Sequence, residues 1–347
     1  MNQKPVENPE RTTETRWTQR NAPAGADLES DHSVLRRSPP FRLNSLCSSR
    51  LCGPFRAPTA SFRLSLGIVL VLVTGSLRAE PVSSRGKPEP YDWVEPMRAL
   101  TREFRGTDGK VLRLGDSITY ANPGSAYLRY GKERSPEQLA VCRWMKADVR
   151  DKSSGVWLSI DDQPGGRSHT AASGVTTAQF LAGGKGGLPK LDDLLREHNP
   201  QVACVLLGTN DLNAQPDPDA FARNLDAIIT RLLANKTIPV LTTVPPRRGK
   251  DALVGQFNEV VWRLGAQHKV PVIDYHGEIL SRRPADWDGT LVSQDGVHPS
   301  AGESAGPATE ANLSRSGYLL LGWATLNKLG EIKREVIDRK GPAPAAK

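Results

Sequence analysis

Residues 202–211 read VACVLLGTND, a continuous apolar run that ends in a polar turn. An uninterrupted run of this kind is typical of a strand buried on both faces of a parallel sheet. With four similar runs elsewhere, it predicts five strands, at Val111–Leu114, Gly155–Ile160, Val202–Leu207, Pro239–Val244 and Val270–Tyr275.

Amphipathic segments lie between these runs. Within residues 218–235 the apolar side chains recur at helical spacing, so one face of the segment is buried. Helices are predicted at Leu188–His198, Pro218–Asn235, Lys250–Lys269 and about Ser316–Arg339. Because strands and helices alternate, we expect an α/β three-layer sandwich with a mainly parallel five-stranded sheet flanked by helices.

Polar motifs follow the predicted strands, where open parallel sheets bind their ligands. GDSIT stands at 115–119, ASGVTT at 172–177, GTND at 208–211 and DGVHP at 295–299. Each motif alone has an ordinary explanation, since a Ser before a helix is more often an N-cap and Asn-Asp after a strand is usually a turn. The four motifs together, in this order, are far more specific.

This order resembles the SGNH, or GDSL-type, hydrolase superfamily over about residues 111–339, and the resemblance implies a flavodoxin-like fold. It implies that Ser117 is a nucleophile, that His298 is its general base and that Asp295 orients the base. The chemistry of these residue types agrees. A serine hydroxyl needs a base to take its proton, and a histidine titrates near working pH. A carboxylate three residues before the histidine can hold Nδ1 and leave Nε2 for the serine.

The resemblance also implies an oxyanion hole. Its donors would be the backbone N–H groups of Ser117 and Gly174 and the side-chain amide of Asn210. Donors fixed where negative charge develops are worth a few kcal/mol each, so Asn210 should affect rate more than binding.

Several features depart from the family pattern. The segment between Ser117 and Gly174 is long, and His169 stands where the family often has a short polar motif, so we expect His169 to have a structural or substrate-contact role. Asp211 is expected to be a turn residue or an acceptor behind the site. The insertion at Ser300–Asn312 follows the proposed base directly, and we expect it to influence specificity.

The first 63 residues carry ten basic against six acidic side chains, which is half of the chain's net charge of +8. They predict a disordered basic region, and the scattered arginines give no reason to expect a nucleic-acid partner. The uncharged run at 64–77 has a basic flank and predicts an export signal over 64–79. Because more than sixty residues precede it, two interpretations stay open: translation starting closer to the run, or an uncleaved anchor that tethers the protein to a membrane.

The remaining boundaries predicted are a Pro-rich linker at 80–96, the hydrolase domain at 97–339 and a disordered tail at 340–347. Cys204 lies in an apolar run and is expected to be a buried thiol, with a bridge to Cys142 as the alternative. The sequence has no His/Cys cluster with metal-ligand spacing, so we expect neither a metal nor a cofactor. The oligomeric state stays open.

We therefore expect an exported serine esterase that acts on a small, short-chain ester or an acylated glycan. The sequence lacks the G-x-S-x-G motif of ordinary α/β-hydrolases, and the glycine-rich loop at 183–187 lacks the Ser or Thr of a phosphate loop. A lipid esterase, a thioesterase and an acyltransferase remain alternatives within enzymes. A non-catalytic carbohydrate-binding or scaffold protein on the same fold is the alternative from another class, because fold alone does not establish activity.

Overall fold

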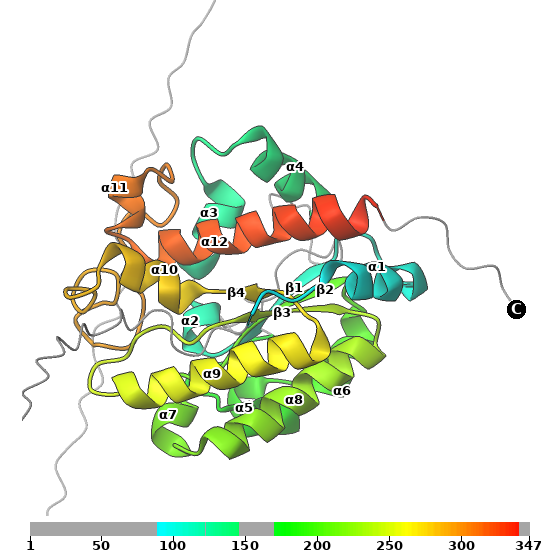
Figure 1. The fold of residues 1–347 in the computed structure, drawn as a ribbon, viewed down its shortest axis with the longest axis horizontal. Coiled ribbons are helices and arrows are strands. Elements are labelled where there is room, and N and C mark those ends of the chain that lie inside the picture. The colour runs from blue at the N-terminus through cyan, green and yellow to red at the C-terminus, as the bar shows by residue number, and fades with distance from the viewer. Residues whose placement is uncertain (1–88, 122, 146–169, 340–347) are drawn as a thin grey trace, which may run out of the picture. The chain divides into compact units, whose positions relative to one another are not determined.

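The computed structural model describes residues 89–121, 123–145 and 170–339 (Figure 1). Within these residues four parallel strands form one sheet in the order β1-β2-β3-β4. The strands are β1 (Val111–Gly115), β2 (Val202–Leu206), β3 (Ile238–Thr242) and β4 (Val272–Ile273). The α/β fold and the parallel sheet are thus confirmed with four strands rather than five, and the strand predicted at Gly155–Ile160 lies outside the described residues.

Neighbouring strands pair in register along the sheet. Val111 lies beside Val202 and Gly115 beside Leu206, so β1 and β2 are paired over their full lengths. Every residue of β1, β2 and β3 is buried, as in a sheet that is covered on both faces. On the other side of β1, Gly115 forms a parallel bridge with Ala171, so the ASGVTT segment begins directly beside the first strand.

β4 is shorter than the predicted strand Val270–Tyr275. Pro271 has no N–H to donate to a neighbouring strand, although its carbonyl accepts from Leu241 N at 3.0 Å. Asp274 ends the strand because its side chain accepts a hydrogen bond from Gly277 N and caps the helix α10 (Tyr275–Arg282).

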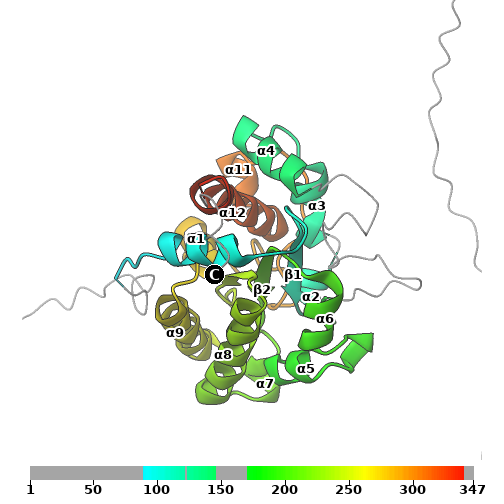
Figure 2. The same cartoon turned by 90° about the vertical axis from the view of Figure 1, so that its right-hand side faces the viewer.

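Helices lie on both faces of the sheet (Figures 1 and 2). One layer holds α5 (Thr177–Ala182), α6 (Leu191–His198), α7 (Asp211–Ala214), α8 (Pro218–Ala234) and α9 (Asp251–His268). The other holds α3 (Pro123–Tyr130), α4 (Pro136–Trp144), α10, α11 (Glu310–Leu313) and α12 (Gly317–Ile332), which continues into the short helix η4 (Lys333–Ile337). The four predicted helices are present, with ends shifted by a few residues.

The apolar stripe predicted for residues 218–235 faces the core. Phe221 of α8 stacks on Phe257 of α9 with ring centroids 4.4 Å apart, and both side chains are buried. Burial of one large apolar side chain stabilises the fold by about 1.5–3 kcal/mol, so this contact fixes α8 and α9 against each other.

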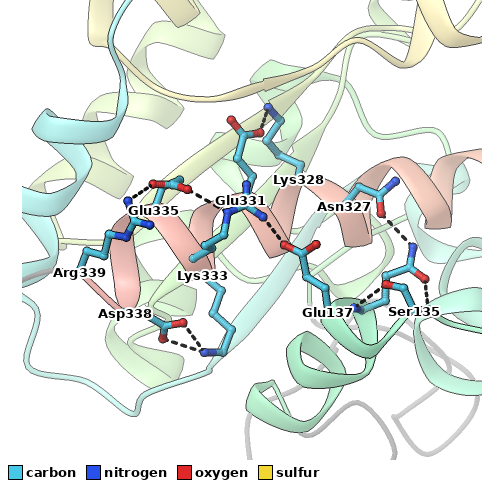
Figure 3. A network of polar contacts seen from close by, with 11 residues as sticks. Ser135, Glu137, Asn327, Lys328, Glu331, Lys333, Glu335, Asp338 and Arg339 are labelled. Atoms are coloured by element: carbon cyan, nitrogen blue, oxygen red, sulfur yellow. Dashed lines mark hydrogen bonds and ion pairs between the residues drawn. The ribbon is translucent and has the colours of Figure 1, made fainter.

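Polar contacts fix α12 against α4 on the opposite face (Figure 3). Gln138 Nε2 donates to Asn327 Oδ1 at 2.9 Å, and Arg334 pairs with Glu137. The Arg334–Glu137 pair is exposed, and pairs of this kind contribute little to stability, so the apolar face of α12 carries most of the packing energy.

Helix α1 (Val94–Glu103) begins three residues before the predicted start of the domain at 97. Cys142 and Cys204 are both buried and form no disulfide, and burial raises the pKa of the Cys204 thiol to about 12. Within the described ranges no helix is both long and apolar enough to cross a membrane. The segments at 1–63, 64–79 and 340–347, and His169, lie outside the described residues.

Candidate active site

The structure brings Ser117, His298 and Asp295 together at the carboxyl end of the sheet. Ser117 is the first residue of the short helix α2 (Ser117–Tyr120), immediately after β1. Its Oγ lies 2.9 Å from His298 Nε2, and His298 Nδ1 lies 2.6 Å from Asp295 Oδ2. One continuous chain of hydrogen bonds therefore runs from the hydroxyl through the imidazole to a carboxylate.

The second oxygen of Asp295 organises the loop that carries the histidine. It accepts hydrogen bonds from Ser293 Oγ at 2.7 Å, Val297 N at 2.8 Å and His298 N at 2.9 Å. Partial burial raises the pKa of the Asp295 carboxyl, but the hydrogen bonds from His298, Ser293 and Val297 outweigh it and hold the pKa well below its usual range. Asp295 is consequently an oriented carboxylate at neutral pH.

A second carboxyl group, Asp116, lies directly before the serine and is fully buried. Its Oδ1 caps α2 by accepting from Ile118 N at 3.0 Å, and its Oδ2 accepts from Asn210 Nδ2 at 3.3 Å. Burial raises the pKa of Asp116 to about 7, against the opposing hydrogen bond from Ile118. Asp116 thus connects the turn that bears Ser117 to the turn that bears Asn210.

The side-chain amide of Asn210 reaches both neighbouring motifs. Nδ2 lies 3.1 Å from Val175 O, one residue after Gly174, and 3.3 Å from Asp116 Oδ2, one residue before Ser117. Gly174 itself has φ +71°, a conformation that favours glycine. Both amide hydrogens of Asn210 are directed at protein oxygens, so donation to a substrate oxygen requires that one of these contacts be shared or exchanged.

Asp211 supports the same region from behind. Its carboxylate accepts from Thr177 Oγ1 at 2.5 Å and from Thr177 N at 3.1 Å, which ties the start of α7 to the start of α5. Burial raises the pKa of Asp211, and the hydrogen bonds from Thr177 oppose the rise. These contacts match the acceptor role expected for Asp211.

Two cationic side chains near the site were not predicted from the sequence as site residues. Arg247, after β3, donates to the carbonyl of Thr209, the residue before Asn210. Burial lowers the pKa of Arg247, while the charges of Asp116 and Asp295 oppose the change. The Lys185 ammonium lies beside Gly174, 3.4 Å from the point where a Cβ would stand. The sequence contains a signal that could have located Arg247, because this residue follows a strand as Ser117 and Asn210 do. No comparable signal marks Lys185.

The insertion at Ser300–Asn312 is anchored at several points. Lys132 N donates to Ala305 O at 3.0 Å, which holds the middle of the insertion against the end of α3. Ser316 Oγ donates to Ala301 O at 2.9 Å, and Tyr318 N to Ser300 O at 3.0 Å. The backbone beyond His298 is therefore bound to the start of α12, and an influence of the insertion on specificity stays a prediction.

The model of the GDSL-like lipase/acylhydrolase family matches residues 114–302, more than half of the chain, and this range includes all five predicted site residues. No curated protein is similar enough in sequence to match.

Several solved structures are similar to the chain. The lipase/acylhydrolase from Enterococcus faecalis is 20% identical and the match covers 64% of this chain and 95% of that one, with a TM-score of 0.40. A catalytic mutant of Axe2, an acetylxylan esterase from Geobacillus stearothermophilus, is 17% identical over 65% and 96% of the two chains, with a TM-score of 0.43. The psychrotrophic esterase EstA from Pseudoalteromonas sp. is 15% identical over 65% and 100%, with a TM-score of 0.43.

The raised pKa of Asp116 predicts a pH-dependent stability. The folded protein keeps a proton up to about pH 7 that the unfolded chain releases near pH 4, so the stability from this proton is complete below pH 4 and is lost as the pH rises to 7. The loss is at most about 1.4 kcal/mol per pH unit. We expect the free energy of unfolding of the wild type, relative to Asp116→Asn, to fall between pH 4 and 7 and then level off, as measured by urea denaturation.

The control for this measurement is Asp219→Asn, which changes an exposed carboxylate in α8 and should keep the wild-type pH dependence. A difference between wild type and Asp116→Asn that is constant from pH 4 to 8 would contradict the raised pKa.

Proposed function

We propose, for a chain that belongs to the GDSL-like lipase/acylhydrolase family and hydrolyses ester bonds, that Ser117 is the nucleophile, His298 the general base and Asp295 the carboxylate that orients it. The observation that carries the proposal is the chain of hydrogen bonds from Ser117 Oγ to His298 Nε2 and from His298 Nδ1 to Asp295 Oδ2. A neutral serine becomes a useful nucleophile only when such a base accepts its proton during attack.

In the proposed reaction, Ser117 Oγ attacks the ester carbonyl carbon while His298 Nε2 takes the hydroxyl proton. The imidazolium that forms is stabilised by Asp295, whose low pKa keeps it ionised. His298 then gives the proton to the oxygen of the leaving alcohol, and the acyl group remains on Ser117. In the second half, His298 takes a proton from a water molecule while the water oxygen attacks the acyl carbon. His298 then returns this proton to Ser117 Oγ as the bond from the acyl carbon to Oγ breaks, which releases the carboxylic acid and restores the free serine.

The negative charge that develops on the carbonyl oxygen needs fixed donors. We assign this role to the backbone N–H groups of Ser117 and Gly174 and to the side-chain amide of Asn210. The contacts of Asn210 beside both other donors support this assignment. The carboxyl group of Asp116 and the carbonyl of Val175 hold the amide in place before substrate binds, and donation to the oxyanion requires that Asn210 share or exchange one of these contacts.

We propose a short acyl group on a polar alcohol, such as an acetylated glycan, as the substrate. The side chains of His298 and Asp295 are 39% and 48% exposed, so the proposed reacting centre is open to solvent. Long acyl chains are bound in apolar channels, whereas the surroundings here include the cationic groups of Lys185 and Arg247. The apolar run at 64–77 supports export, which would bring the enzyme to extracellular or periplasmic polymers.

Ser117→Ala should abolish hydrolysis of p-nitrophenyl acetate, because the variant lacks the oxygen that forms the acyl intermediate. Labelling by a fluorophosphonate, followed by mass spectrometry of the labelled peptide, should disappear with it. Ser173→Ala, which removes an exposed hydroxyl next to Gly174, is the matched control and should keep both activities. A Ser117→Ala protein with wild-type turnover would remove this residue from the mechanism.

Asn210→Ala should lower kcat by about 10²–10³ with a small change in KM, since an oxyanion donor acts mainly in the transition state. Steady-state kinetics on p-nitrophenyl acetate measure both constants. Asn213→Ala changes an exposed amide on α7, the short helix that follows Asn210, and should leave both unchanged. If KM rose by about this factor while kcat stayed constant, Asn210 would contribute to ground-state binding instead.

The proposed substrate class is tested by a panel of p-nitrophenyl esters of rising chain length together with acetylated oligosaccharides. We expect kcat/KM to fall at least about tenfold from acetyl to octanoyl, since the open, polar site offers a long chain little apolar surface to bury. Acetylated oligosaccharides should be deacetylated at rates comparable to the best small ester. A preference for octanoyl esters would favour a lipid esterase.

A further inference from the structure

A groove runs along β4, the edge strand of the described sheet. It consists of two hollows with cavity volumes of about 520 and 500 Å³, and Trp262 and Asp274 line both. The first hollow lies over β4 itself, between α9 and α12, and the second lies beyond the ends of β3 and β4. We call this surface the tryptophan groove, after Trp93, Trp262, Trp287 and Trp323.

The tryptophan side chains of the described residues are concentrated in this groove. Four of the five described tryptophans line it, and each is only partly buried, with its ring packed on the core and part of it at the surface. They come from four separate places in the chain, the segment before α1, helix α9, the loop after α10 and helix α12. A flat, rigid, half-exposed indole offers an apolar face at low entropic cost and suits the C–H face of a pyranose ring.

The polar groups of the groove suit hydroxyl groups. Six carboxylates line the two hollows against one lysine: Glu89, Asp251, Glu259, Asp274, Glu278 and Glu331. The lysine, Lys328, pairs with Glu331 at 2.6 Å (Figure 3). Its ammonium also lies over the ring of Trp93, 5.5 Å from the ring centre. Two of the six carboxylates are ion-paired, Glu331 with Lys328 and Glu278 with Arg282. The Arg282 guanidinium lies 5.5 Å from the centre of the Trp323 ring. Carboxylates accept hydrogen bonds from sugar hydroxyls, and the negative charge that remains repels an anionic polymer.

The second hollow adjoins the proposed active site through the backbone. Pro246 lines the hollow, and the next residue, Arg247, donates to the carbonyl of Thr209 beside Asn210. Trp287 O accepts from Val292 N at 2.9 Å, in the loop that leads to Asp295. The second hollow and Ser117 therefore both lie beyond the carboxyl ends of the strands, with β2 and β3 between β4 and the strand β1 that leads to Ser117.

We propose that the tryptophan groove binds a neutral polysaccharide whose chain extends from the groove across the carboxyl ends of the strands to Ser117. The groove would recognise the unsubstituted part of the polymer by stacking and hydroxyl hydrogen bonds, and the site would act on an acyl group carried by the same chain. The second half of this statement rests on the proposed function; the binding of a neutral glycan does not.

The test uses full-length Ser117→Ala protein and unacylated polymers, so that turnover plays no part. Native gels containing xylan, glucomannan or mixed-linkage β-glucan should retard this protein, and Trp262→Ala or Trp323→Ala added to it should weaken retardation at least tenfold. Tyr130→Ala, which removes an aromatic ring that is 64% exposed on α3, is the matched control and should bind as the parent does.

Oxidation by N-bromosuccinimide supplies a readout that needs no groove mutation and so does not depend on a variant folding. Bound polysaccharide should protect Trp262 and Trp323 in the Ser117→Ala protein, as measured by peptide mass spectrometry. The proposal is overturned if no neutral polymer retards or protects the protein, if the tryptophan variants bind as tightly as the parent, or if polygalacturonate binds more tightly than the neutral polymers. If the polysaccharide tests fail while the fluorophosphonate still labels Ser117, only the groove proposal is wrong. If a neutral polysaccharide binds but Ser117 is not labelled, only the proposed mechanism is wrong.

Discussion

The parallel register between β1 and β2 determines where the reactive side chains can stand. Gly115 lies beside Leu206, so the turns after the two strands start at the same level of the sheet. A Cβ at Gly115 would stand 2.6 Å from Leu206 O and 2.1 Å from Thr119 Oγ1, so this approach requires glycine. From this level, Asp116 and Asn210 reach each other across the strand ends. Without the register, neither the hydroxyl nor the amide would have a fixed position.

Two carboxyl groups near the serine are placed in opposite environments. Asp295 is half exposed and accepts four hydrogen bonds, which keep it ionised, whereas Asp116 is buried and retains its proton to about pH 7. Divergent environments of this kind commonly mark separate roles for two acids in one site. Asp295 faces the imidazole, where a permanent charge is useful. Asp116 fixes a helix start and an amide, and its hydrogen bonds with Ile118 N and Asn210 Nδ2 offset part of the cost of its burial.

The sequence predicted the parts of this arrangement that depend on short-range order. Continuous apolar runs located β1, β2 and β3, and the motifs after them located Ser117 and Asn210, because a strand end is a local feature. β4 is shorter than predicted because Pro271 has no N–H to donate and Asp274 caps the helix α10. The apolar character of the run does not reveal this competition between strand pairing and helix capping. Lys185 reaches Gly174 only through the turn that precedes α6. The tryptophan groove joins residues more than 200 positions apart, and no periodicity in the sequence relates them.

In the proposed function, the tryptophan groove supplies binding energy that the small, solvent-exposed reacting centre lacks. A short acyl group has few atoms, and even the best small ligands gain only about 1.5 kcal/mol per non-hydrogen atom, so the acyl group alone cannot orient a substrate strongly. Binding energy from distant parts of a substrate can instead supply the orientation that the reaction needs. In this protein Trp262 and Trp287 line the hollow beyond the ends of β3 and β4, and β2 separates these strands from β1 and Ser117. A glycan held there would bring its ester to the hydroxyl with its entropy already reduced, and the small, solvent-exposed site would then need to recognise only the ester itself.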